Sequence, residues 1–304
     1  MQAIVFEEFG GPDVLHVKEI AEPHAGPGEI RVAVKAAGVN PMDYKIRHGW
    51  MEQAFATPLP AVPGLEIAGV VDEVGAGVTD VAVGDEVLGW SATGAYAQYA
   101  LAETAVPKPA SLGWVEAAAI PVAGETAARV LDELLLRDGE TLLLHGAAGA
   151  VGSVAAQLAT ARGAIVIGTA SPANHEYVRS LGAIPVTYGD GLVERVRSVA
   201  PQGVDAVFDA AGKGALPDSI ELRGGTTDRI VTIADPAAAE LGVTFSSGGT
   251  APEQKRAGLA ENTRLAAEGA LRLRIAGTFP LAEAAQAQQT SEDGHANGKL
   301  VITP

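Results

Sequence analysis

Three glycines at three-residue intervals follow an apolar run in the stretch LLLHGAAGAVGSVAAQ. Gly146, Gly149 and Gly152 could allow the backbone to turn tightly around the phosphates of a ligand. Small residues at regular spacing also let two helices approach closely, often in a membrane. The elements that flank the glycines decide between these two interpretations.

The membrane interpretation concerns residues 141–161, which carry no formal charge. A span needs about twenty mostly apolar residues. This segment instead contains the three glycines, His145 and Gln157, and its apolar pattern changes period midway. It reads as a strand, a turn and a helix that begins near residue 150. The first residues, MQAIVFEEFG, also lack the basic segment and apolar core of a signal peptide. We therefore expect no membrane segment and a cytoplasmic location.

Charge and cysteine content exclude several other kinds of site. The 304-residue chain has a formal net charge of −16 and no basic block. It therefore does not suit nucleic acid or an anionic membrane, which attract clustered lysine and arginine. The absence of cysteine excludes disulfides, thiolate zinc sites and cysteine nucleophiles. A chain of this length is expected to form about two domains.

The pattern of secondary structure changes near residue 122. Residues before it alternate apolar and polar side chains between Gly-Pro turns, which indicates strands. After it, apolar strands alternate with helices, which is typical of βαβ units and a parallel sheet. The helices are expected at 150–162, 172–181, 190–199 and near 252–269. Because the last thirty residues again read as strands, we expect an α/β protein with domains formed by 1–121 plus 275–304 and by 122–274.

The glycines lie between a strand over 141–146 and the helix from about residue 150. In a dinucleotide-binding fold, one glycine permits the tight turn, the next lets the backbone approach the pyrophosphate, and the last lets helix and strand pack closely. The residues in this pattern are Gly146, Ala147, Gly149 and Gly152. The N–H groups that open the helix, at Ala150 and Val151, would face the phosphates. The sequence therefore predicts a dinucleotide site.

The second strand of the βαβ unit indicates which dinucleotide binds. An acidic residue about 20 positions beyond the glycines usually accepts a hydrogen bond from the ribose of NAD. Ala170 and Ser171 stand there instead, and the missing carboxylate favours NADP (NADPH). Four polar side chains could hydrogen-bond its 2′-phosphate: Ser171, Asn174, His175 and Tyr188. Alternatively, Ser171 and Asn174 merely cap a helix that begins near Pro172.

Motifs spread over the whole chain resemble one family, the zinc-free quinone oxidoreductases of the medium-chain dehydrogenase/reductase superfamily. The matching stretches are AAGVNPMDYKIRHG, PGLEIAGVVDEVGAGVTDVAVGDEV, GAYAQYALA, IPVAGETA, HGAAGAVG and GHANGKLVI. The resemblance implies a Rossmann domain and a GroES-like catalytic domain built from both chain ends, with the active site in the cleft between them.

Catalytic zinc is not expected. The family members that use zinc hold it with a cysteine, a histidine and usually a second cysteine, and these positions match Asn40, Leu65 and Val122. Six scattered histidines form no pair at ligand spacing. Glu66 remains beside the lost histidine and is expected to be structural. Without a Lewis acid, the family suggests reduction of quinones or α,β-unsaturated carbonyls (enones).

The segment NPMDYK supplies the candidate catalytic residues. Asn40 matches a family asparagine near the nicotinamide ribose, although asparagine before proline is also a standard helix opening. Tyr44 and Lys45 could each donate a proton to the substrate oxygen; the alternatives are a packed ring and a solvated lysine. Asp43 and Arg47 are expected to form an ion pair one helical turn apart.

Four further residues are candidates with structural alternatives. Trp90 could form a wall for the substrate or pack in the core. Thr126 matches a family position near the nicotinamide; the alternative is that it caps a helix or packs within one. Asn297 and Lys299 could approach the cofactor, or lie in a solvated turn.

The sequence thus predicts an NADPH-dependent quinone or enone reductase. A reductase of enoyl thioesters would need a basic patch for the carrier, and none is present; a protein that binds NADPH without turnover remains a third possibility. Family members commonly pair their sheets, and residues 242–249 could be an exposed edge strand, which invites another chain. We therefore expect a homodimer.

Overall fold

The computed structural model describes residues 1–294 and 296–304, and the chain divides into two compact units. The first contains Met1–Val122 and Pro252–Pro304, and the second contains Ala123–Ala251. The second unit thus ends at residue 251 rather than at the expected 274. The reason is helix α9 (Pro252–Ala267), whose buried Leu259 packs in a cluster with strand residues of the first unit.

The second unit is built on a six-stranded sheet in the order β12-β11-β10-β7-β8-β9, with every pairing parallel. This is the doubly wound order in which the strand sequence reverses direction at the centre of the sheet. The expected parallel sheet is therefore confirmed. Its strands are β7 (Thr141–His145), β8 (Ile165–Thr169), β9 (Ile184–Val186), β10 (Ala206–Asp209), β11 (Ile230–Thr232) and β12 (Thr244–Phe245).

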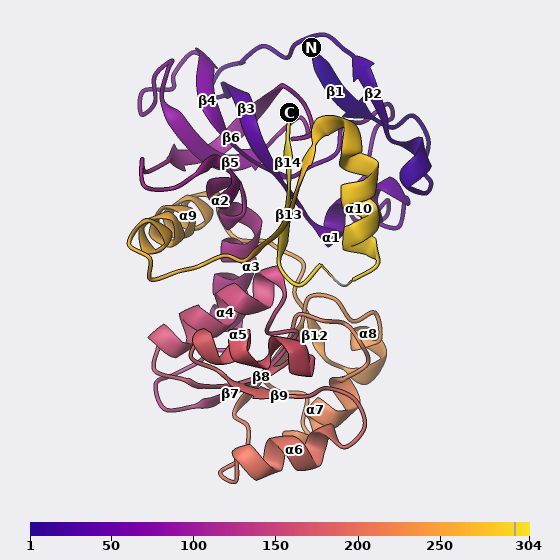
Figure 1. Ribbon diagram of the computed structural model, residues 1–304, viewed down its shortest axis with the longest axis vertical. Helices are drawn as coiled ribbons and strands as arrows, with labels where there is room; N and C mark the ends of the chain where they lie inside the picture. The colour runs from indigo at the N-terminus through magenta and orange to yellow at the C-terminus, as the bar shows by residue number, and fades with distance from the viewer. Residues whose placement is uncertain (295) are drawn as a thin grey trace. The chain divides into compact units, whose positions relative to one another are not determined.

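Helices cover both faces of this sheet. Right-handed crossovers place α4 and α5 on one face, and the reversal after β9 places α6 and α7 on the other, as Figure 1 shows. Helices predicted from the sequence correspond to α4, to a 3₁₀ turn followed by α5, and to α6. The helices are α3 (Ile120–Glu133), which crosses the unit boundary, α4 (Ala150–Ala161), α5 (His175–Ser180), α6 (Leu192–Val199), α7 (Leu216–Leu222) and α8 (Ala238–Leu241).

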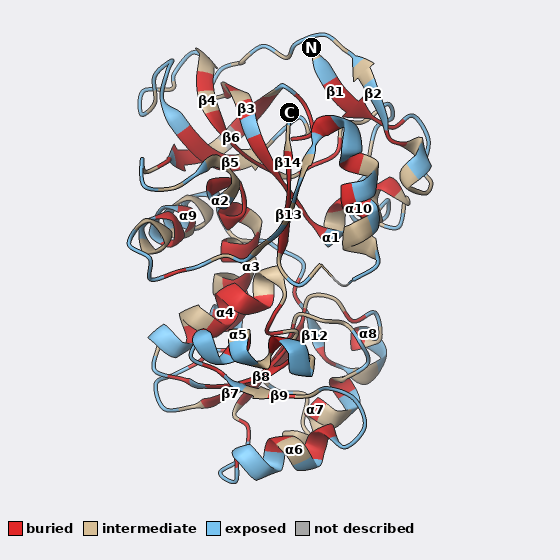
Figure 2. Ribbon diagram, viewed as in Figure 1, coloured by how far each residue is buried: buried red, intermediate tan, exposed pale blue. Residues whose placement is uncertain are grey.

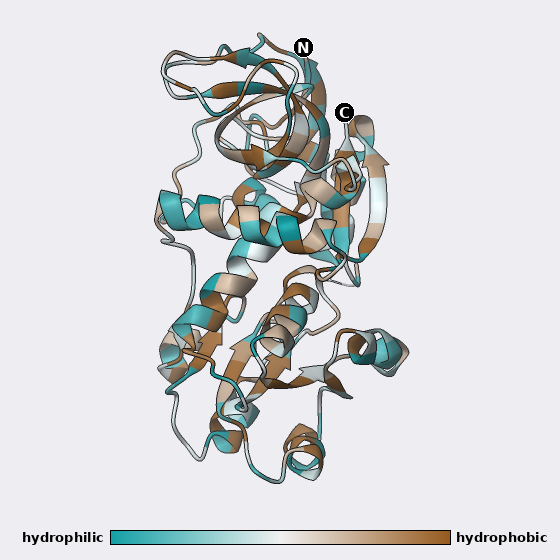
Figure 3. Cartoon of the chain, turned by 90° about the vertical axis from the view of Figure 1, so that its left-hand side faces the viewer, coloured by the Kyte–Doolittle hydropathy of each residue, from teal (hydrophilic) through white to brown (hydrophobic). Residues whose placement is uncertain are grey.

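Burial explains why the central strands are almost wholly apolar. Leu143, Ile167 and Val207 on adjacent strands are fully buried, because helices pack against both faces of a parallel sheet. Figure 2 shows buried residues concentrated in the strands, and Figure 3 shows the same strands as the hydrophobic part of the unit, with hydrophilic residues on the outer helices.

The first unit contains a six-stranded sheet in the order β13-β14-β3-β4-β5-β6. Strand β3 also pairs with β6, so strands β3 to β6 close into a small barrel. The C-terminal strand β14 pairs with β3, which confirms the expected return of the chain to its first domain. The strands are β1 (Gln2–Val5), β2 (His16–Glu19), β3 (Ile30–Val39), β4 (Glu66–Val74), β5 (Glu86–Ser91), β6 (Tyr99–Pro107), β13 (Ile275–Pro280) and β14 (Lys299–Thr303).

The first unit also contains short helices outside the barrel. Besides α9 they are α1 (Pro41–Arg47), α2 (Trp114–Ala118) and α10 (Ala284–Glu292). Helix α1 follows β3 directly and contacts α10. Within the described residues, no helix is long and apolar enough to cross a bilayer.

Candidate functional site

The turn between β7 and α4 requires glycine at two positions. Gly146 has a φ of +76°, a conformation that favours glycine. A Cβ on Gly152 would lie 2.1 Å from the carbonyl oxygen of Gly146, so only glycine lets the first turn of α4 pack this close to the end of β7. Thr169, at the end of β8, fixes the turn by accepting hydrogen bonds from the backbone N–H groups of Gly146 (3.2 Å) and Ala147 (3.1 Å).

The same turn leaves backbone N–H groups for a ligand. Gly149 is the extended N-cap residue of α4, so the N–H groups of Ala150 and Val151 in the first turn have no intrahelical acceptor. The helix dipole adds positive potential at this end. A turn that a side chain would block, followed by free N–H groups, fits the pyrophosphate of a dinucleotide.

His145, the last residue of β7, supports this turn, a role that the sequence did not reveal. Its imidazole is buried at the end of β7; its Nε2 lies 2.9 Å from the Ser219 hydroxyl and its Nδ1 lies 3.4 Å from the Thr169 hydroxyl. Burial lowers the pKa of His145, although Asp209 opposes the shift. His145 is therefore neutral at neutral pH and acts through Thr169, which holds the glycine turn.

The residues predicted to bind the 2′-phosphate gather at the ends of β8 and β9. The Asn174 amide donates to the Ser171 hydroxyl (3.1 Å), and His175 Nε2 lies 3.5 Å from the hydroxyl of Thr187. Tyr188, the next residue, is exposed. Ser171 opens the 3₁₀ turn, but its hydroxyl makes no capping bond. Asn174 is the N-cap residue of α5, also without a capping bond from its side chain. Both residues thus occupy capping positions, but neither caps through its side chain.

Arg195, which the sequence analysis did not select, shapes the segment that carries Tyr188. Its guanidinium donates to the carbonyl oxygens of Thr187, Tyr188, Gly189 and Asp190. The side chain therefore fixes the loop after β9 rather than offering a free positive charge. No sequence pattern signals this role, because the acceptors are backbone atoms.

Thr126 lies on α3 next to a charged network. Its hydroxyl is 3.4 Å from Glu125 Oε2, and Glu125 also accepts from Arg129 Nε (2.8 Å) and the Thr250 hydroxyl (2.6 Å). The negative charge of Glu125 is therefore balanced by Arg129 within the second unit. A cofactor contact of Thr126 stays a prediction.

In the first unit, a buried ion pair joins the C-terminal strand to the N-terminal part of the chain. The Lys299 ammonium on β14 donates to Glu66 Oε1 on β4 and to Asn40 Oδ1 (2.6 Å). Asn40 Nδ2 donates to the same carboxylate oxygen (2.8 Å), and the backbone N–H of Val122 donates to the other (2.7 Å). Lys299 is 2% exposed and Glu66 is 0% exposed. Glu66 is the centre of this cluster, which we call the Lys299–Glu66–Asn40 triad.

The triad revises the predicted roles of two residues. A solvated turn is wrong for Lys299, because its ammonium is buried against a carboxylate. Asn40 is the N-cap residue of α1 and is followed by proline, as expected, and its side chain also bonds Glu66 and Lys299. Asn297 has a φ of +52°, which asparagine tolerates better than most residues. Contacts of Asn40, Asn297 and Lys299 with the cofactor stay predictions.

Asp43 and Arg47 do not form the expected ion pair, because both are buried and bond other elements. Asp43 Oδ2 accepts from the Asn40 backbone N–H (2.8 Å) and from the Tyr96 hydroxyl (2.7 Å). Arg47 donates to Gln288 (2.8 Å) and Glu292 (2.7 Å) on α10. Burial raises the pKa of Asp43 to about 7, and its Oδ1 has no hydrogen-bond partner among the described residues. Asp43 is thus partly protonated near neutral pH.

Helix α1 presents two candidate proton donors between these anchors. Lys45 is half-buried, and its ammonium forms no hydrogen bond or ion pair with the part of the chain that the structure describes; burial lowers its pKa. Burial, assisted by the charge of Glu292, raises the pKa of Tyr44. Both shifts favour the uncharged forms. The Tyr44 ring meets the Trp50 ring edge-on at 6.3 Å between centroids.

Trp90 lies near the end of β5, where helix α9 covers it. The Lys255 ammonium is 4.1 Å from the centre of the indole, and the ring packs against the buried cluster beneath α9. These contacts favour the packing interpretation of Trp90, and its contact with substrate stays a prediction.

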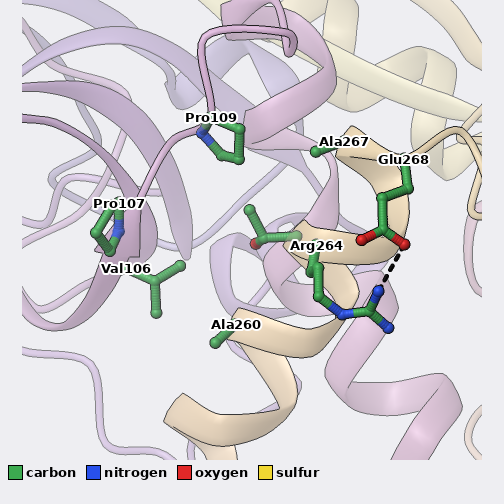
Figure 4. Close-up of a pocket in the computed structure, with 8 residues that line it drawn as sticks. Val106, Pro107, Pro109, Ala260, Arg264, Ala267 and Glu268 are labelled. Carbon is green, nitrogen blue, oxygen red and sulfur yellow. Dashed lines mark hydrogen bonds and ion pairs between the residues drawn. The ribbon is translucent and has the colours of Figure 1, made fainter.

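A cavity of about 280 Å³ lies elsewhere in the first unit, between α9 and the end of β6. Figure 4 shows apolar side chains around it and the ion pair between Arg264 and Glu268 (2.5 Å) beside it. None of the predicted site residues is among those that line it.

Metal ligands are not clustered in the described residues. Over 1–294 and 296–304, no group of three or more histidine, aspartate or glutamate side chains is arranged to hold a metal ion. The residues at the zinc-ligand positions of the family, Asn40, Leu65 and Val122, contribute an amide and two apolar side chains, which are poor ligands for zinc.

Comparisons with known proteins place this geometry among oxidoreductases. Family models match the "alcohol dehydrogenase GroES-like domain" at residues 26–111 and the "zinc-binding dehydrogenase" at residues 181–302. The chloroplastic NADPH-dependent alkenal/one oxidoreductase of Arabidopsis thaliana is 33% identical, over 100% of this chain and 80% of that protein. The structure of the quinone oxidoreductase from Coxiella burnetii is similar at a TM-score of 0.88 and 32% identity, over 100% of this chain and 99% of that one. The Escherichia coli quinone oxidoreductase complexed with NADPH matches at 0.87 and 27%, over 100% of both chains.

The raised pKa of Asp43 predicts a specific pH dependence of stability. Because the folded-state pKa of about 7 exceeds the ordinary value, the stabilising effect of the protonated carboxyl is complete below about pH 4 and is lost as the pH rises through 7. Asp43→Asn keeps a neutral, isosteric group. Between pH 5 and 7 the free energy of unfolding of Asp43→Asn should therefore rise relative to that of the wild type, by up to about 1.4 kcal/mol per pH unit. Urea denaturation of both proteins across this range measures the difference; a difference that does not change with pH contradicts the assignment.

Proposed function

This chain belongs to the quinone oxidoreductase family of the medium-chain dehydrogenases and reductases, and we propose that it reduces a quinone or an enone with NADPH, without a metal ion. The observation that carries the proposal is helix α1. The buried triad anchors its N-cap residue, Asn40. Tyr44 lies on the next turn together with Lys45, whose ammonium has no partner among the described residues. The glycine turn of the second unit supplies the dinucleotide site.

The residues of this chain divide the work between binding and proton supply. The N–H groups at Ala150 and Val151 bind the pyrophosphate, and Ser171, Asn174, His175 and Tyr188 contact the 2′-phosphate. When bound, the reduced nicotinamide supplies a hydride. The acceptor's carbonyl oxygen then becomes negatively charged, and a fixed donor is most valuable as that charge develops. Tyr44 or Lys45 stabilises and protonates this oxygen.

The same residues support the proposed independence from metal ions. A quinone or an enone accepts hydride with less electrophilic assistance than an alcohol dehydrogenase must provide, so a donor hydroxyl or ammonium replaces the Lewis acid. The names of two relatives, one an alkenal/one oxidoreductase and one a quinone oxidoreductase, support these two acceptor classes. An enoyl-thioester reductase is disfavoured by the acidic chain, which has a net charge of −16.

Activity measurements on conservative variants test the proposal. The wild type should oxidise NADPH with 1,4-naphthoquinone and with but-3-en-2-one, and exhaustive chelation should leave both rates unchanged. Tyr44→Phe removes only the hydroxyl, and Lys45→Met removes only the charge. Whichever residue donates the proton, its variant should lower kcat for butenone by roughly 10²-fold at unchanged NADPH affinity.

Two outcomes of these measurements would count against the proposal. If both variants reduce butenone at the wild-type rate, water supplies the proton. A wild-type protein that binds NADPH but oxidises none with any quinone or enone contradicts the proposed function and favours the non-catalytic alternative.

NADPH is the proposed cofactor because no carboxylate stands at the end of β8, where Ala170 and Ser171 are found. NADPH should bind at least tenfold more tightly than NADH, which corresponds to about 1.4 kcal/mol. Ala170→Asp should reverse this preference, since a carboxylate repels the 2′-phosphate. Ala170→Asn is the matched uncharged control. Fluorescence titration of the three proteins with NADPH and NADH measures the six dissociation constants, and equal affinities of the wild type for both dinucleotides contradict this assignment.

A homodimer is proposed from strand β12, which is the last strand at one edge of the parallel sheet. The edge leaves unpaired backbone groups beside the exposed Phe245, and such an edge can pair with a second chain. Light scattering of the wild type should give the mass of two chains. Phe245→Lys should shift the protein toward monomer, whereas Val83→Lys, at an exposed position of the first unit, should not. A monomeric wild type at micromolar concentration is the contrary result.

A further inference from the structure

The segment that follows α1 carries an aromatic ring that is exposed and also held in place. Trp50 is 63% exposed, although large aromatic side chains normally bury most of their surface. Its indole stacks on the His48 imidazole with the centroids 4.4 Å apart and the planes 9° from parallel. The Tyr44 ring meets it at 90°. The indole is therefore an exposed surface with a defined orientation.

The support of this ring extends into the buried interior of the first unit. His48 Nε2 lies 2.7 Å from Glu292 Oε1, and Arg47 Nη2 donates to the other oxygen of this carboxylate. Arg47 is 0% exposed. Hydrogen bonds from Arg47 and His48 lower the pKa of Glu292 although burial opposes them, so Glu292 stays ionised and keeps both partners. A fixed ring costs less conformational entropy when it binds a ligand than a mobile ring does.

We infer that the Trp50 indole is the surface on which the ring of a planar acceptor stacks, and that it makes the protein selective for quinones over small linear enones. Trp50 packs edge-on with Tyr44, one of the two candidate donors, so a ring lying on the indole is a neighbour of the Tyr44 side chain. A flat, two-ring molecule has a large contact area when it stacks on an indole, whereas a four-carbon enone has little. The inference rests on the proposed function, because it names the acceptor class of the same site.

Kinetics with two acceptors separate this role from a structural one. Trp50→Ala should lower kcat/KM for 1,4-naphthoquinone roughly tenfold through KM, because binding energy common to ground state and transition state is lost. The value for but-3-en-2-one should stay within about twofold of the wild type. Trp50→Phe keeps a ring and should restore most of the naphthoquinone value. Phe55→Ala removes another exposed ring (47%) from the same segment and should change neither acceptor.

Two results overturn the inference: an equal loss for both acceptors in Trp50→Ala, which indicates a structural role, or no loss for naphthoquinone. Calorimetric titration with naphthoquinone keeps the test separate from the proposed function. If the wild type binds naphthoquinone more tightly than Trp50→Ala does but reduces no acceptor, the stacking surface stands and the proposed function fails. If neither protein binds it, the inference fails.

Discussion

A buried charge pair sets the geometry of the first unit. Lys299 and Glu66 lie 233 residues apart in the sequence, and their contact ties the last strand to the barrel. A buried ion pair is stable only when further hydrogen bonds satisfy both charges. Asn40 and the backbone of Val122 provide them. Removing one partner of such a pair costs about 3–5 kcal/mol, so β14, β4 and the start of α1 are fixed together.

Close packing at Gly38 preserves this arrangement. A Cβ on Gly38 would lie 2.2 Å from Glu66 Oε1 and 2.8 Å from the carbonyl oxygen of Ala118, so a larger residue would displace the carboxylate. Helix α1 then leaves the triad with Asp43 and Arg47 turned into the interior and with Tyr44 and Lys45 less buried. The interior side holds the helix, and the other side carries the groups proposed to act on substrate. In the second unit, Gly146 and Gly152 have the corresponding task, because they bring the backbone to a position that a side chain would occupy.

Local features were predictable from the sequence, and long-range contacts were not. The β7–turn–α4 unit follows from glycine spacing and apolar periodicity, and the opening of α1 follows from Asn40 before proline. Asp43 and Arg47 stand one turn apart, which suggested a pair, yet Arg47 bonds Glu292, 245 residues away. For Lys299, the sequence left a cofactor contact and a solvated turn as the alternatives, because nothing nearby in the sequence reveals Glu66 as its partner. The boundary at residue 251 was missed because the pattern of α9 shows that one face is apolar but not which sheet it covers.

The most direct measurement of the central claim follows the hydride. The protein is mixed with but-3-en-2-one and NADPH that carries deuterium on both positions of nicotinamide C4, and the reduced ketone is analysed by mass spectrometry and NMR. The account predicts butan-2-one with one deuterium at C4, the former terminal alkene carbon, and a solvent-derived hydrogen at C3. Unlabelled butanone, or deuterium at the carbonyl carbon of an alcohol product, would contradict it.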